Sequence, residues 1–133
     1  MAGVMGSSAL PKPTEAELSI LRVLWRRGPS TVRRVWEDLN RAQATGYTTV
    51  LKLMQIMAAK RLLTRDDRER SHVYSPTLPE EETQKQLVKH LLERAFSGSA
   101  QKLVLQALSA TRASRQELAQ IRKLLEKLEG GPQ

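Results

Sequence analysis

Apolar positions in the middle of the chain follow a helical period. Across residues 47–60, Val50, Leu53, Met54 and Met57 fall at i, i+3, i+4 and i+7, which is the spacing of a helix packed on a core. The opposite side of this segment is short, polar and basic, and it carries Thr48, Thr49, Lys52 and Gln55. The pattern predicts one amphipathic helix with a polar, basic outer face.

The residues that follow change to an extended pattern. After Lys60 the chain reads LLTRDDRERSHVY, in which an apolar stretch and the β-prone HVY flank a strongly charged tip. This order predicts a two-stranded hairpin.

Two helical patterns precede these elements. Thr14 and Glu17 have the spacing of a capping box, which predicts a helix that begins here and ends at Gly28-Pro29. Its buried side carries Leu18, Leu21, Leu24 and Trp25. After Ser30-Thr31, a second helix repeats the same spacing with Val32, Val35, Trp36 and Leu39.

Three amphipathic helices followed by one hairpin are in the order of a winged helix-turn-helix, in a mainly α protein. Short helices are unstable alone in water, so these three must share one core. We assign residues 11–76 to this domain. Residues 1–10 are small, uncharged and rich in Gly and Ser, which predicts a disordered lead-in.

The pattern after Pro76 predicts a three-helix domain at residues 77–129, followed by a tail at 130–133. Three helices in so short a segment are small for a free-standing core, and their apolar stripes are wide. We therefore expect a second copy of the chain to cover them in a homodimer, although the last stripe has the alternative of an intrachain core. The expected dimerisation residues are Leu87, Leu91, Leu92, Phe96, Leu103, Val104, Leu118, Ile121, Leu124, Leu125 and Leu128.

Composition and charge add a class of partner to this picture. The 133 residues are 40% apolar and only 4% aromatic, which favours helices over a β-sandwich. The net charge is +8; residues 1–78 carry 13 Lys+Arg against 7 Asp+Glu, or +6, and residues 79–133 carry 9 against 7, or +2. An anionic polymer such as nucleic acid is therefore attracted mainly to the N-terminal part.

Other function classes find little support in the sequence. The absence of Cys excludes disulfides, thiolate metal sites and a cysteine nucleophile. His72 and His90 are the only histidines, and no Gly-rich phosphate loop or nucleophile–base pair is present, so we expect no enzyme, cofactor or metal site. No long apolar run or export signal occurs, so we expect a cytoplasmic protein without membrane insertion.

Five sequence blocks closely resemble one family, the penicillinase-repressor (BlaI/MecI/CopY) family of bacterial transcription regulators. They are PTEAELSILRVLW, TVRRVWEDL, YTTVLKLMQIMAAKRLLTRD, RSHVYSP and FSGSAQKLVLQAL. The blocks lie between Pro13 and Leu108, and the resemblance as a whole runs from about Leu10 to Leu128. The YTTV and HVY blocks at this distance from each other are specific to the family, whereas a helix-turn-helix pattern alone would be a weak signal. The resemblance implies a winged-helix domain with a C-terminal dimerisation domain, which binds a palindromic operator as a dimer and represses transcription.

The resemblance also shows two departures. Family members that respond to β-lactams are inactivated when a membrane sensor-protease system leads to cleavage at an Asn-Phe bond, and the matching dipeptide here is Gln106-Ala107. That partner and cleavage position are thus implied by family analogy only, and the changed dipeptide argues against them. Copper-responsive members carry C-terminal cysteines, which this chain lacks, so a direct thiolate switch is excluded.

In a winged helix bound to DNA, the third helix enters the major groove. Thr48 and Thr49 occupy its first turn, where they either meet phosphate and thymine or only cap the helix. Lys52, one turn on, is expected to reach phosphate or a guanine edge, unless it is a solvated surface lysine. Tyr47 either contacts the DNA backbone or anchors the turn with its ring in the core.

The hairpin tip supplies further candidates. Arg68, Arg70 and His72 suit phosphate or a narrow minor groove, and Arg70 is the strongest of them. Lys12 and Arg33, near two helix starts, are expected to contact phosphate. The alternative for the hairpin is pairing with the interleaved Asp66, Asp67 and Glu69. The sequence thus predicts a dimeric, sequence-specific DNA-binding repressor, with a protein-interaction module on the same fold as the alternative.

Overall fold

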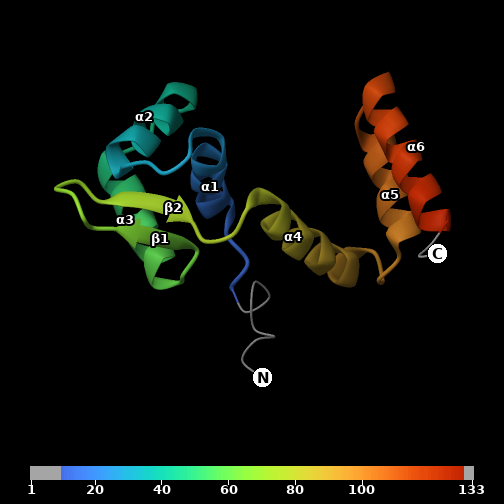
Figure 1. Ribbon diagram of the computed structural model, residues 1–133, viewed down its shortest axis with the longest axis horizontal. Coiled ribbons are helices and arrows are strands. Elements are labelled where there is room, and N and C mark those ends of the chain that lie inside the picture. Colours follow the sequence, from blue (N-terminus) through green and yellow to red (C-terminus); the bar gives the residue numbers. More distant parts are fainter. Residues whose placement is uncertain (1–9, 131–133) are drawn as a thin grey trace. The chain divides into compact units, whose positions relative to one another are not determined.

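The computed structural model describes residues 10–130 (Figure 1). Its elements are α1 (Glu15–Arg27), α2 (Val32–Ala42), α3 (Tyr47–Ala59), β1 (Leu63–Asp66), β2 (Val73–Pro76), α4 (Glu80–Ala95), α5 (Ala100–Ala110) and α6 (Arg115–Gly130). Three helices precede a hairpin and three helices follow it, so the predicted winged-helix order in a mainly α chain is confirmed. The predicted lead-in and tail lie outside the described residues, apart from Leu10 and Gly130.

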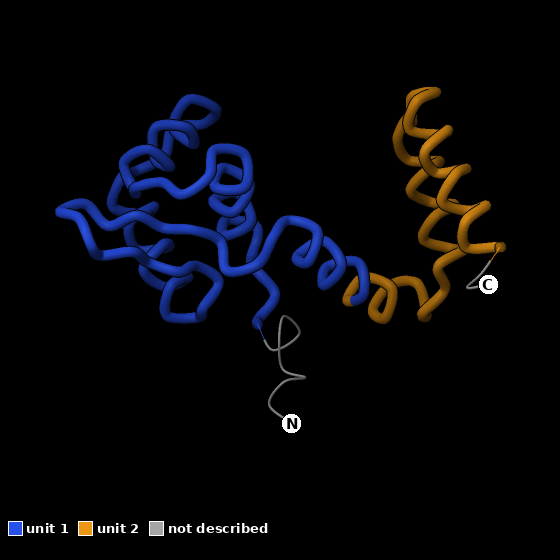
Figure 2. The backbone as a smooth tube through the Cα atoms, in the orientation of Figure 1, with its two compact units in different colours: residues 1–89 blue, residues 90–133 orange. Residues whose placement is uncertain are grey.

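The chain forms two compact units, residues 1–89 and 90–133, so the division falls inside α4 (Figure 2). The first half of α4 belongs to the first unit. Thr83 is buried there, and the Gln86 side-chain amide donates to the Leu10 carbonyl at 2.7 Å. The predicted boundary lies earlier, after Pro76. Pro76 and Pro79 mark where the chain leaves the hairpin and α4 begins, but they do not show how far along α4 the contacts with the first unit continue.

Local sequence signals fix where the helices begin and end. The Thr14 hydroxyl accepts from the Glu17 amide at 3.2 Å, while the Glu17 carboxylate accepts from the Thr14 amide at 2.9 Å. Ser114 and Glu117 repeat this capping box at the start of α6. Gly28 ends α1 with a φ of 92°, a conformation that costs glycine little. The predicted signals at Thr14–Glu17 and Gly28 are thus confirmed.

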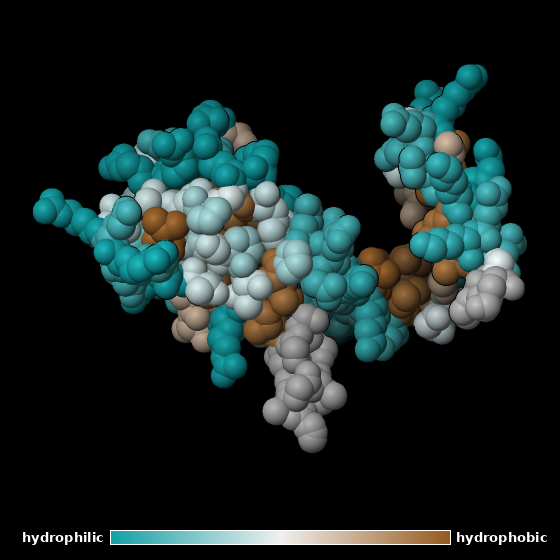
Figure 3. Space-filling view, in the orientation of Figure 1, coloured by the Kyte–Doolittle hydropathy of each residue, from teal (hydrophilic) through white to brown (hydrophobic). Residues whose placement is uncertain are grey.

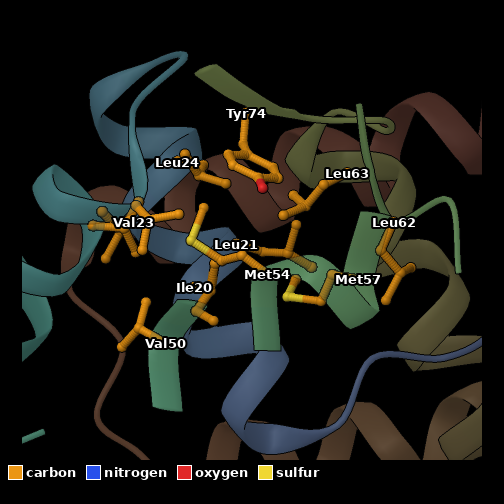
Figure 4. Close-up of a cluster of buried hydrophobic side chains, with 12 residues drawn as sticks. Ile20, Leu21, Val23, Leu24, Val50, Met54, Met57, Leu62, Leu63 and Tyr74 are labelled. Atoms are coloured by element: carbon orange, nitrogen blue, oxygen red, sulfur yellow. The ribbon is translucent and has the colours of Figure 1, made fainter. Parts of the chain in front are cut away.

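The core of the first unit is built mainly from α1, α3 and the hairpin, with Val32 and Val35 from α2 (Figure 4). The α3 pattern is confirmed, since Val50, Met54 and Met57 are fully buried. Trp25, on the buried side predicted for α1, packs at the edge of the core, half-buried, and its ring N–H donates to the Leu78 carbonyl at 3.1 Å. The other buried apolar side chains are Ile20, Leu21, Val23, Leu24, Leu62, Leu63 and Tyr74.

The hairpin is tied to the helices by its second strand. β1 and β2 pair antiparallel, with Leu63 opposite Pro76 and Asp66 opposite Val73. Tyr74 exchanges two backbone hydrogen bonds with Ser30, the residue between α1 and α2, at 3.0 and 2.8 Å. This bridge, together with the buried Tyr74 ring, holds the base of the wing against the helix-turn-helix and leaves its charged tip exposed.

Candidate nucleic-acid interface

Polar, exposed side chains occupy most of the outer face of α3, and none of them is tied up by a cap or an ion pair within the described part of the chain. Thr48, Thr49 and Lys52 are all exposed. Gly46 is the N-cap of α3, and no side chain caps this end. The alternative that either threonine merely caps the helix is therefore wrong. Among the described residues Lys52 makes no ion pair, so its charge faces solvent uncompensated.

Tyr47 and Arg33 join α2 to the start of α3. The Tyr47 ring packs edge-on against Trp36, with centroids 5.9 Å apart and planes at 79°. The Arg33 guanidinium lies 5.9 Å from the centroids of both rings. Trp36 is fixed in turn by its ring N–H, which donates to the Thr45 carbonyl at 2.7 Å. Tyr47 thus anchors the turn, yet 40% of it stays exposed beside an unpaired arginine.

The wing tip has most of its charge paired internally. The Arg68 guanidinium and amide donate to Asp66, and these bonds lower the pKa of Asp66 to about 2. Asp67 accepts from His72 and from Arg65, and these bonds lower its pKa as well. Both carboxylates are therefore ionised at neutral pH, and they offset the charge of Arg68 and Arg65.

Arg70 is the exception among the described basic residues of the wing tip. It is exposed and, in the part of the chain that the structure describes, it forms no ion pair. An unpaired guanidinium loses no existing partner when it meets a phosphate, whereas Arg68 must give up Asp66. The Arg68–Asp66 ion pair therefore makes Arg70 the better candidate of the two for a phosphate contact.

Several predicted residues meet around one cleft. A hollow of about 360 Å³ lies between α2, α3 and the wing, and its walls include Arg33, Tyr47, Gln55, Arg65 and His72. Three of these five, Arg33, Tyr47 and His72, are DNA-contact candidates predicted from separate parts of the sequence. Lys12 is exposed ahead of α1 and forms no hydrogen bond or ion pair with the other described residues, so the structure does not bring it to this cleft.

Sequence reasoning missed an ion cluster around one buried carboxylate of α2. The Asp38 side chain is only 4% exposed and lies near three arginines, Arg27, Arg26 and Arg41. The hydrogen bond from Arg27 and the neighbouring charges outweigh the effect of burial and lower the pKa of Asp38. Because Arg27 belongs to α1, this cluster joins the end of α1 to α2. The spacing of these residues in the sequence does not predict the cluster.

Sequence reasoning also missed Ile56 on the outer face of α3. Isoleucine reads as a core residue in a hydrophobic pattern, yet Ile56 is 48% exposed. Ile56 lies one turn after Lys52, so a helical projection of the sequence would have placed it on the outer face of α3.

The second unit leaves its apolar side chains uncovered. In α5 and α6 no residue is buried, and Figure 3 shows apolar residues at the surface of this region. Of the predicted dimerisation residues, Leu87, Leu92, Phe96, Leu103 and Ile121 are half-buried. The exposed ones are Leu91, Val104, Leu118, Leu124, Leu125 and Leu128.

Gln106 and Ala107, the dipeptide singled out by family analogy, lie exposed inside α5. A protease would have to unwind this helix locally to reach the bond between them. Within residues 10–130, no helix has both the length and the apolar character needed to cross a membrane. The same residues contain no group of three or more His, Asp or Glu side chains placed to hold a metal ion.

Comparison with known proteins gives the family. The model of the penicillinase repressor family matches residues 13–127. The chain is 32% identical over 119 residues to the transcriptional regulator BlaI of Mycobacterium tuberculosis, covering 88% of this chain and 85% of that protein. It is 22% identical over 117 residues to the penicillinase repressor of Bacillus licheniformis, covering 88% and 91%.

Among solved structures, the DNA-binding domain of the repressor BlaI matches with a TM-score of 0.49 and 22% identity, covering 55% of this chain and 89% of that domain. The family assignment follows from the sequence matches, which extend over both compact units. The chain belongs to the penicillinase repressor family, and the two relatives named above are a transcriptional regulator and a repressor.

Proposed function

We propose that this protein is a dimeric, sequence-specific DNA-binding repressor that binds a palindromic operator in the bacterial cytoplasm. The observation that carries the proposal is the outer face of α3, where Thr48, Thr49 and Lys52 are exposed, neither threonine caps the helix, and Lys52 forms no ion pair with any residue in the range 10–130. Side chains that do not stabilise the fold are available to bind a partner. Hydroxyl groups and a lysine ammonium suit the phosphates and base edges of a DNA duplex.

Each group on α3 has a defined role in this proposal. The threonine hydroxyls and the free amides of the first turn bind phosphate, because a helix N-terminus carries unsatisfied donors and a positive dipole end. A threonine methyl packs against a thymine methyl, and Lys52 reaches a phosphate or a guanine edge. The face thus combines positioning contacts with base-reading contacts.

The flanking cations position α3 in the groove. Arg33, held against the Tyr47 ring, and the unpaired Arg70 lie in the two elements that border α3, namely α2 and the wing. Guanidinium groups bind phosphate with two parallel hydrogen bonds, which fixes orientation as well as adding affinity. Arg68 and His72 contribute only if they exchange Asp66 and Asp67 for DNA, and Lys12 adds a contact with a separate phosphate.

The second unit supplies the dimer. Helices with no buried residue cannot be stable as a solitary pair, because helices this short depend on burial of their apolar stripe. A second copy offers the same stripe in a two-fold arrangement, and a palindrome has the matching symmetry. Two linked domains also raise affinity through effective concentration, with no new contact in either half-site.

A salt titration tests the proposal against its rival. The full chain is titrated with a palindromic duplex, selected by binding from a random pool, and with a scrambled duplex of equal length. A repressor shows affinity that falls steeply with salt and a preference for the palindrome of about 10³-fold or more. If the two duplexes bind equally weakly, the winged helix is a protein-interaction module instead, and the proposal is wrong.

A further inference from the structure

Ile56 is an apolar side chain on a polar surface. Within residues 10–89, the large apolar residues that are exposed are Tyr47, Ile56 and Val88. The Tyr47 ring packs against Trp36, and Val88 lies on α4. Ile56 lies on the outer face of α3, and it is the most exposed of the three at 48%.

The local structure gives no reason for isoleucine at this place. A β-branched side chain lowers helix propensity relative to alanine, lysine or glutamine, so position 56 gains nothing for the stability of α3. Exposed apolar surface is also unfavourable in water. One exposed isoleucine on a surface is ordinary, but its place on the face that the proposed function assigns to DNA makes its chemistry relevant.

The helical projection places Ile56 in line with the groups already described. At about 100° per residue, Ile56 is rotated about 40° from Lys52 and about 20° from Thr49. Its Cα lies about 10 Å along the axis from that of Thr49, since each residue rises 1.5 Å. With base pairs about 3.4 Å apart, this separation corresponds to about three base pairs along a groove that α3 follows.

We propose that Ile56 is a specificity-determining residue that contacts the C5-methyl group of a thymine in the major groove. The inference rests on the proposed function and deepens it. Thymine is the one base with a methyl group at the major-groove edge, so an apolar side chain there selects an A·T pair in a defined orientation. The contacted thymine lies about three base pairs from the pair that Thr49 meets.

Replacement of thymine by deoxyuridine tests this contact directly, because it removes the methyl group and leaves base pairing intact. Each thymine of the selected operator is replaced in turn, in both half-sites, and affinity is measured for the wild type, for Ile56→Ala and for Thr49→Ser. Thr49→Ser is the matched control, since it deletes only the other candidate methyl on the same face. Because Ile56 is exposed, Ile56→Ala is expected to leave the Tm unchanged.

The expected result is one thymine whose replacement weakens wild-type binding about fourfold per half-site, the value for about one buried methyl group. Ile56→Ala has lost that sensitivity, whereas Thr49→Ser retains it. If Ile56→Ala shows the same deoxyuridine profile as the wild type at every position, the inference is wrong and the proposed function stands. If the wild type does not prefer the operator over random duplex, the proposed function itself fails.

Discussion

The two compact units use their apolar side chains in opposite ways. In the first, Leu24, Val35 and Met54 are at most 1% exposed, and the outer face of α3, which we propose binds DNA, is polar apart from Ile56. In the second, α5 and α6 bury no residue, and Leu128 is 65% exposed. The first unit has a closed core within one chain, whereas the open stripe of the second is the surface that we propose a second copy covers.

This difference assigns separate tasks to the two parts of the family fold. A unit with a closed core can expose a polar face for recognition without loss of stability. A unit with an open core converts association into stability, so its folding and its assembly are one event.

The largest effect is expected from charge on the open stripe. Leu124→Asp together with Leu128→Asp places two carboxylates on the proposed seam, so we expect a monomer in sedimentation. Operator affinity then falls by on the order of a hundredfold or more, because the two half-sites are no longer linked.

Gln116→Asp with Gln120→Asp is the matched control for the seam. It adds the same charge at exposed positions of α6 and is expected to leave the dimer intact. A leucine double variant that still sediments as a dimer, with unchanged operator affinity, would show that the stripe is not the seam.

The next effect concerns the closed unit. Glu17 is 2% exposed, and its carboxylate accepts from the Lys60 ammonium at 2.7 Å, which joins the start of α1 to the end of α3. Glu17→Gln should cost about 1.5 to 3 kcal/mol of unfolding free energy, the value of a hydrogen bond to a charged group. The loss should not depend on protein concentration, unlike a loss at the seam.

The same pair sets a pH dependence. Burial raises the pKa of Glu17, but the bonds from Lys60 and Thr14 outweigh it, so the folded pKa lies below the ordinary 4.5. The unfolded chain then takes up a proton more readily than the folded one. The contribution of Glu17 is therefore fully present above about pH 4.5 and declines as the pH falls through the lower folded value.

Chemical denaturation as a function of pH measures this contribution. Glu17→Gln should flatten the acid limb of the stability curve, whereas Glu15→Gln, an exposed neighbour in the same helical turn, should not. If Glu17→Gln and the wild type lose stability equally as the pH falls, the Glu17–Lys60 ion pair does not contribute to the pH dependence.

The smallest effect is expected in the wing. Arg70→Ala should weaken operator binding by about threefold to tenfold and reduce the slope of log affinity against log salt by about one, because one phosphate contact is lost. Arg68→Ala removes the same charge from the same loop but also frees Asp66, so its direct loss should be smaller. An equal or larger loss for Arg68→Ala would mean that the Asp66 pair dissociates on DNA.

Local signals made most of the fold predictable from the sequence. Capping boxes at Thr14 and Ser114, the stop at Gly28 and the α3 stripe each depend on residues within one or two turns. The Glu17–Lys60 pair joins residues 43 positions apart, and the Asp38 cluster joins two helices, so no local spacing reveals them. Only tertiary packing brings such partners together.

The candidate site was predictable in outline but not in detail. The polar face of α3 follows from its period, yet sequence alone left open whether the threonines cap the helix, and Gly46 takes that place. The wing reads as six alternating charges, so the choice between Arg68 and Arg70 depends on pairing that only coordinates show. Ile56 was missed because an isoleucine reads as core.

The most direct test of the central claim compares two exposed lysines, one on each unit. Lys52→Ala on α3 and Lys123→Ala on α6 both remove one exposed cation, and operator affinity is measured for each at fixed salt beside the wild type. We predict that Lys52→Ala weakens binding about tenfold or more while Lys123→Ala has no effect. Equal affinity for the two variants would contradict the assignment of α3 to DNA.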